Sequence, residues 1–89
     1  MESKRNPNDA VTWSKKGIAL GKLGKYDEAL SCFDNAIEIN PNLDMAWFGK
    51  GPALANLGRH YEAIRCYDKA IDIDPNLAVA WYSKAWCML

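Results

Sequence analysis

The cysteines and the single histidine are the side chains best suited to nucleophilic or metal chemistry in this chain of 89 residues. Cys32, Cys66 and Cys87 are odd in number and far apart, unlike a disulfide framework. His60 has no cysteine or second histidine at the spacing of a zinc site. No nucleophile is paired with a base, and no glycine-rich phosphate loop follows a strand. The sequence therefore predicts no enzyme activity, no metal and no cofactor.

Composition narrows the class of protein further. The 11 basic and 11 acidic residues balance, so we expect no nucleic-acid and no membrane partner. Hydrophobic residues make up 49% of the chain, which is enough for a packed core. No apolar run is long enough to cross a membrane, and the opening "MESKRNPND" lacks the hydrophobic core of a signal peptide. A soluble, cytoplasmic protein is the expectation.

An internal repeat organises the chain. Pro7, Pro41 and Pro75 are spaced by 34 residues each time. Residues 10–43 align without a gap on residues 44–77, and half of the aligned positions are identical. Such self-similarity at a fixed period is the signature of a repeat protein.

Each repeat contains two helical patterns. The first predicts a helix in residues 10–24, because apolar and small residues recur at spacings of three and four. The predicted packing face consists of Trp13, Gly17, Leu20 and Leu23. Gly24 is expected to end this helix as a cap with positive φ. The second pattern begins at Tyr26, and Pro41 bars its continuation. Its stripe consists of Ala29, Phe33, Ala36 and Ile37.

The second repeat copies this scheme, with helices predicted at about 43–56 and 60–73, and a further helix from about 77 to the end. The predicted fold is therefore all-α, with five helices. We divide the chain into an N-terminal tail and turn, two full repeats and the first helix of a third, truncated repeat. These units span residues 1–8, 9–42, 43–76 and 77–89.

The repeats resemble the tetratricopeptide repeat (TPR), in the style of prokaryotic arrays. The first carries the pattern at Trp13, Gly17, Leu20, Tyr26, Ala29, Phe33, Ala36 and Pro41. The second carries it at Trp47, Gly51, Leu54, Ala63, Tyr67, Ala70 and Pro75. The resemblance covers residues 6–89 and implies a helix-turn-helix solenoid, used as a scaffold that binds proteins or peptides.

The resemblance also implies a binding groove, since the first helix of each TPR repeat lines the concave side. The implied groove residues are Val11, Ser14, Lys15, Ile18, Lys22, Met45, Phe48, Gly49, Pro52, Asn56, Val79, Tyr82, Ser83 and Trp86. Because many are apolar, an extended or helical peptide is expected there, with Lys15 and Lys22 receiving an acidic flank. A surface buried only by further repeats is the alternative.

Two known TPR specificities are missing from this sequence. One type clamps the C-terminal carboxylate of chaperone tails with Lys, Asn and Arg, and another carries a ladder of asparagines. The positions of the clamp hold Ser14, Ile18, Gly49, Val79 and Ser83. The positions of the ladder hold Lys15, Gly49 and Ser83.

The second repeat departs from the TPR pattern at two further places. Pro52 stands where the first repeat has Ile18, and a mid-helix proline costs about 3 kcal/mol. It predicts either a kink held by packing on both sides, or one that reshapes the binding surface or acts as a hinge for domain swapping. His60 and Tyr61 replace the aromatic seen at Tyr26. One of the two is expected to fill its pocket, with His60 in a surface or packing role.

The last predicted helix, residues 77–89, is apolar nearly all round, and such helices are normally buried. Either the chain is a segment of a longer array, or a second copy covers this helix, and the two explanations are compatible. We expect a homodimer or higher oligomer. The residues implied in self-association are Trp81, Ala85, Trp86, Met88 and Leu89. The predicted function is a protein-interaction module that binds a protein or peptide partner. The alternatives are a purely structural, self-assembling repeat segment and the scaffold region of a larger enzyme.

Overall fold

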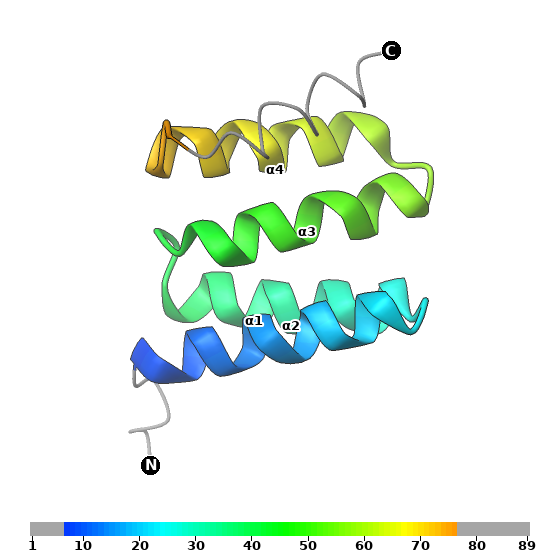
Figure 1. The fold of residues 1–89 in the computed structure, drawn as a ribbon, viewed down its shortest axis with the longest axis horizontal. Coiled ribbons are helices and arrows are strands. Elements are labelled where there is room, and N and C mark those ends of the chain that lie inside the picture. Colours follow the sequence, from blue (N-terminus) through cyan, green and yellow to red (C-terminus); the bar gives the residue numbers. More distant parts are fainter. Residues whose placement is uncertain (1–6, 77–89) are drawn as a thin grey trace.

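The structure, a computed structural model, describes residues 7–76. All regular secondary structure in this range is helical, which confirms the all-α prediction (Figure 1). Four helices are present there rather than the predicted five, because the predicted fifth helix, residues 77–89, lies outside the described residues. The four are α1 (Pro7–Lys22), α2 (Tyr26–Ile39), α3 (Asp44–Asn56) and α4 (His60–Ile73).

Glycine turns end the first helix of each repeat. Gly24 has φ 80°, a conformation that costs glycine little, and the Lys25 N–H donates to the Leu20 carbonyl at 2.9 Å. Gly58, at φ 82°, ends α3 in the same way. These turns reverse the chain, so α1 packs on α2 and α3 packs on α4. Gly24 has the positive φ predicted for it.

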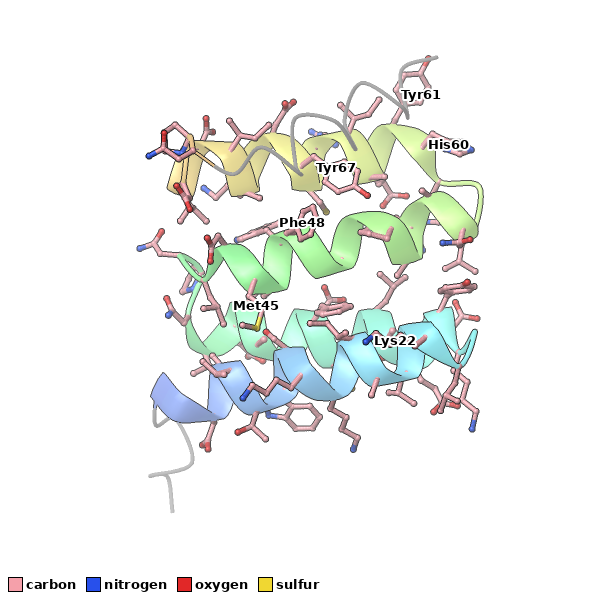
Figure 2. The ribbon with its side chains drawn as sticks, in the orientation of Figure 1. Lys22, Met45, Phe48, His60, Tyr61 and Tyr67 are labelled. Carbon is pink, nitrogen blue, oxygen red and sulfur yellow. The ribbon has the colours of Figure 1, made fainter. Side chains whose placement is uncertain are left out.

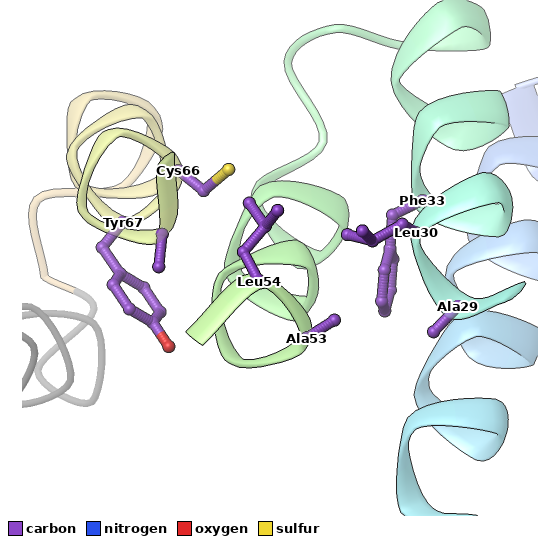
Figure 3. Packing of buried hydrophobic residues seen from close by; sticks show 8 residues of the cluster. Ala29, Leu30, Phe33, Ala53, Leu54, Cys66 and Tyr67 are labelled. Atoms are coloured by element: carbon purple, nitrogen blue, oxygen red, sulfur yellow. The ribbon is translucent and has the colours of Figure 1, made fainter. Parts of the chain in front are cut away.

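The core lies between these helix pairs, and α2 also packs against α3 (Figure 3). Phe33 of α2 and Tyr67 of α4 occupy equivalent places in the two repeats, and both are buried. The main cluster of buried residues consists of Ala29, Leu30, Phe33, Ala53, Leu54, Ala63, Cys66 and Tyr67. The stacked pairs form the helical solenoid expected from the repeat.

Two predictions about large side chains are wrong, one for Leu23 and one for the pair His60 and Tyr61. Leu23 was assigned to the packing face of α1, but it is 71% exposed because the helix ends at Lys22 and Leu23 lies in the turn. His60 and Tyr61 are both exposed, and Figure 2 shows them at the start of α4. Neither fills the pocket that one of them was expected to fill.

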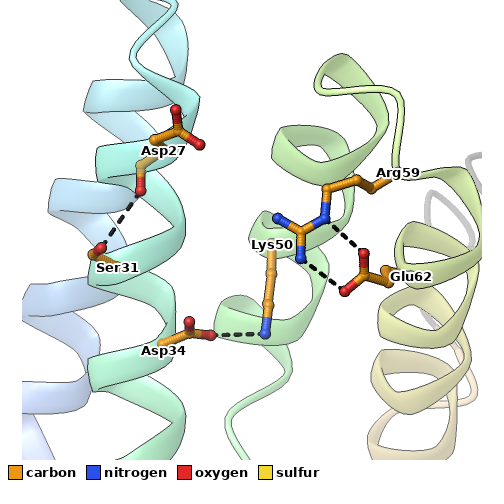
Figure 4. A network of polar contacts seen from close by, with 6 residues as sticks. All are labelled: Asp27, Ser31, Asp34, Lys50, Arg59 and Glu62. Atoms are coloured by element: carbon orange, nitrogen blue, oxygen red, sulfur yellow. Dashed lines mark hydrogen bonds and ion pairs between the residues drawn. The ribbon is translucent and has the colours of Figure 1, made fainter.

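Polar contacts join the two repeats (Figure 4). The Lys50 Nζ of α3 lies 2.7 Å from the Asp34 Oδ1 of α2, and 5.8 Å from the centre of the Trp47 ring. The Trp47 Nε1–H donates to the Pro41 carbonyl at 2.7 Å. Such a partly exposed ion pair contributes little stability on its own, so apolar packing holds the two repeats together more than this pair does.

The described helices carry no feature of a membrane span or a metal site. Within residues 7–76, no helix combines the length and hydrophobicity needed to cross a bilayer. Nor do three His, Cys, Asp or Glu side chains of this range gather in one place where a metal ion would bind.

Candidate functional site

A groove with a volume of about 360 Å³ opens between α1 and α3, and α2 contributes to its lining. From α1 come Gly17, Ile18, Gly21 and Lys22. From α2 come Tyr26 and Phe33. From α3 come Met45, Phe48, Gly49, Pro52, Ala53 and Asn56. The volume suits one or a few side chains of a ligand, and the apolar lining is typical of binding pockets.

The depth of the groove comes from missing side chains. Gly17 and Gly49 both lie against the Phe33 ring, and a Cβ added to them would stand 2.9 and 2.5 Å from its Cε1. Gly21 faces open space, since a Cβ there would have no neighbouring atom within 4 Å. The backbones of α1 and α3 therefore approach the ring directly and leave room above it.

The two ends of the groove differ in polarity. Met45 lies in the first turn of α3, whereas Lys22 and Asn56 lie in the last turns of α1 and α3. In Figure 2 the side chains of Lys22 and Met45 lie between α1 and α3. Lys22 is exposed, and the Asn56 Nδ2 donates to the Pro52 carbonyl at 2.8 Å. The groove thus has an apolar body with a cation and an amide at one end.

The structure gathers many of the predicted groove residues in one place. Ile18, Lys22, Met45, Phe48, Gly49, Pro52 and Asn56 all line the groove. Val11 and Lys15 lie outside its lining, and Ser14 is completely buried. Val79, Tyr82, Ser83 and Trp86 lie outside the described residues. That a ligand binds these residues stays a prediction.

Five lining residues were not among those predicted, namely Gly17, Gly21, Tyr26, Phe33 and Ala53. The repeat pattern named Gly17, Tyr26 and Phe33 as part of the fold. It gave no role to Gly21 or Ala53. Gly17 and Gly21 are one helical turn apart, which places them on one face. That spacing was the available signal, because two glycines on one face leave a hollow beside any ring that packs there.

Ser14 is an exception to the apolar packing around it. It is 0% exposed, and its Oγ has no hydrogen-bond partner among the described residues. The equivalent residue of the second repeat is Phe48, which lines the groove. A buried hydroxyl without a partner destabilises the fold, so Ser14 serves neither packing nor the groove surface well.

A second, more open cleft of about 490 Å³ lies over α3 and α4. Its lining consists of Pro41, Trp47, Lys50, Leu54, Glu62, Arg65, Cys66 and Lys69. Burial raises the pKa of the Cys66 thiol to about 11, although Lys50 opposes the shift. The thiol is therefore neutral near pH 7 and poorly suited to nucleophilic chemistry.

Comparison with family models gives a consistent result across the chain. A model described as tetratricopeptide repeat matches residues 10–43 and 45–77, and a second model of the same description matches residues 66–89. A comparison with curated proteins finds no match.

Two solved structures are similar to this chain. One is the second TPR of Spaghetti (RPAP3), bound to the HSP90 peptide SRMEEVD. Its TM-score is 0.90 at 20% identity, over 99% of this chain and 82% of that chain, so the likeness is one of fold. The other is YrrB, described as a TPR protein with an unusual peptide-binding site. Its TM-score is 0.82 at 34% identity, over 90% of this chain. This chain spans only 41% of that chain's length.

Proposed function

Because the chain belongs to the tetratricopeptide repeat family, we propose that it is a protein-interaction module that binds a peptide in the groove between α1 and α3. The observation that carries this proposal is the groove itself, an apolar hollow with Lys22 and Asn56 at one end. Both similar structures are described by the peptide they hold or the peptide site they contain, which supports a peptide as the occupant here.

The groove favours an apolar anchor over a carboxylate clamp. Its apolar lining includes Ile18, Met45, Phe48 and Pro52, and Lys22 is the one cation of its lining among the described residues. A ligand with a bulky apolar side chain and an acidic residue toward Lys22 fits this arrangement. An HSP90-type tail is not expected, since the positions of the carboxylate clamp lack its Lys, Asn and Arg side chains.

Selection from a random peptide library tests the proposal. Peptides enriched on the wild-type chain should lose at least roughly tenfold in affinity when Phe48 is changed to Ser, because the apolar wall of the groove is lost. Tyr61→Ser is the matched control, since Tyr61 is 88% exposed and lies outside the groove. Circular dichroism should show that both variants keep their helices. Enrichment of no peptide, or equal binding by Phe48→Ser, would contradict the proposal.

Self-association through residues 77–89 is a separate part of the proposed function. Its support is the apolar character of that segment, which includes Trp81, Ala85, Trp86, Met88 and Leu89 and lies outside the described residues. The match of a repeat model to residues 66–89 supports a further helix there. Light scattering over a hundredfold range of concentration should detect a dimer or larger species. A monomer throughout would refute this part and leave the peptide groove untouched.

A further inference from the structure

Pro52 leaves one carbonyl of α3 without its usual donor. The helix runs from Asp44 to Asn56 with Pro52 inside it. In an α-helix each carbonyl accepts from the N–H four residues later, and proline has no N–H, so the Phe48 carbonyl loses that bond. The equivalent residue of α1 is Ile18, which keeps its N–H. The missing donor at residue 52 therefore distinguishes the second repeat from the first.

This carbonyl belongs to a residue that lines the groove. Phe48 and Pro52 share one face of α3, and both line the groove, with Pro52 exposed and Phe48 partly exposed. In a helix a carbonyl points toward the residue four positions later, which for Phe48 is Pro52, and a proline ring at that position pushes the carbonyl away from the helix axis. Gly49 and Gly51 beside it ease such a tilt. The next carbonyl on this face, that of Pro52, is taken by the Asn56 amide at 2.8 Å.

We propose that the Phe48 carbonyl is a hydrogen-bond acceptor for the ligand, and that the ligand is an extended peptide which donates one backbone N–H to it. This inference rests on the proposed function and specifies how the groove holds its peptide. An adjacent apolar side chain of the ligand enters the hollow beside Gly49 and Met45. Extended peptide is favoured over helix because the N–H groups inside a helix are already bonded, whereas an extended segment offers free donors.

A measurement without ligand tests the acceptor directly. Nuclear magnetic resonance detects a hydrogen bond as a coupling between the amide nitrogen and the carbonyl carbon that it joins. In the wild-type chain we expect no amide of α3 to couple to the Phe48 carbonyl carbon. In Pro52→Ala, which restores an N–H, residue 52 should couple to it. A wild-type coupling from another amide to Phe48 would overturn the proposal, because the acceptor would already be occupied.

A second measurement uses peptides selected from a random library on the wild-type chain. Pro52→Ala and Pro52→Ile should both bind them roughly 3- to 10-fold more weakly, as expected for the loss of one hydrogen bond. N-methylation of one peptide amide should weaken binding to the wild type equally, and should cost nothing more with Pro52→Ala. The Tyr61→Ser variant should bind like the wild type.

The outcomes separate the two proposals. Peptides that bind Pro52→Ala as tightly as the wild type, or that bind as helices, would overturn this inference while the groove function stands. If no peptide is selected, the groove function fails, and with it the role given to the Phe48 carbonyl.

Discussion

The ring of Phe33 lies directly against Gly49, and a Cβ added to this glycine would stand 2.5 Å from Cε1 of the ring. Phe33 is 1% exposed, so the ring is held on its other sides as well. This contact joins the second helix of one repeat to the first helix of the next. It also forms the base of the groove, so stacking of the repeats and the shape of the site depend on the same residue pair.

Gly49→Ala should lower the free energy of unfolding by about 1–3 kcal/mol, because the added methyl group overpacks the ring. The better helix propensity of alanine, about 1 kcal/mol, works against this loss. Gly21→Ala is the matched control, since open space surrounds that position, and it should gain about 1 kcal/mol. Urea denaturation measures both. A Gly49→Ala variant as stable as Gly21→Ala would show that the ring moves aside freely.

Ser14→Ala should leave the free energy of unfolding unchanged or raise it by about 1 kcal/mol, because it removes a buried hydroxyl with no partner among the described residues. Ser31→Ala corrects for the helix propensity of alanine. Ser31 is exposed in α2, and its Oγ lies 3.5 Å from the Asp27 carbonyl. Thermal or urea unfolding of both variants gives the difference. Clear destabilisation by Ser14→Ala alone would reveal a hydrogen bond that the serine makes in solution.

The Cys66 thiol should react slowly in the folded protein. Burial raises its pKa from 9.0 to about 11, so at pH 8 the thiolate is about a hundredfold scarcer than in the unfolded chain. In a Cys32→Ala, Cys87→Ala background, labelling by a disulfide reagent should be slower by at least that factor than in denaturant. Equal rates in the two states would contradict the burial of this side chain.

The raised pKa of the Cys66 thiol also determines how the free energy of unfolding changes with pH. Because the folded pKa of Cys66 is raised, its contribution to the free energy of unfolding is complete below pH 9.0 and is lost as the pH rises toward 11. Cys66→Ala should therefore flatten the loss of stability between those values. A slope identical to that of the wild type would argue against the raised pKa.

Glu62 should make stability depend on acid pH. The Arg59 Nε donates to Glu62 Oε1 at 2.6 Å, and Nη2 donates to Oε2 at 2.9 Å. These hydrogen bonds hold the pKa of the Glu62 carboxyl below its usual 4.5. Because the pKa of the Glu62 carboxyl is lower in the folded state, its contribution to the free energy of unfolding is fully present above pH 4.5. That contribution is lost as the pH falls through the pKa of the folded state.

Glu62→Gln tests this dependence by unfolding measurements between pH 2 and 6. The variant should lose the part of the acid slope that belongs to this carboxyl, and its curve should approach that of the wild type at the acid end. The effect is small, since both side chains are 49% exposed. A variant whose acid slope equals that of the wild type would rule out the lowered pKa.

The ends of the helices could be predicted because glycine and proline residues mark them in the sequence. Gly24, Pro41 and Gly58 mark ends that the structure places within two residues of the prediction. The packing of Phe33 and Tyr67 followed from their place in the repeat, since a ring between two stacked layers is buried whatever its detailed contacts. Period and helix ends are local properties, so one sequence suffices to predict them.

Exposure at helix ends and the floor of the groove were harder to predict. Leu23 continues the apolar spacing of α1, but the helix ends one residue before it, so Leu23 is exposed. The spacing of apolar residues does not indicate where a helix ends. Ser14 was assigned to the groove by the family resemblance, yet α1 meets its neighbours closely enough to bury it. Gly17 and Phe33 line the groove because of a close approach between helices, and the distance between helices is a tertiary property that one sequence does not contain.

The groove is also where the two halves of the chain have diverged. Trp13, Gly17 and Leu20 have identical counterparts 34 residues later, whereas every groove position of α1 predicted from the repeat has a different one. Ile18 of α1 corresponds to Pro52 of α3 and Lys22 corresponds to Asn56, so the two repeats give the groove two unlike walls. A peptide ligand lying between unlike walls would contact different side chains if its N-to-C direction were reversed. Bound ligands should therefore have a single N-to-C direction.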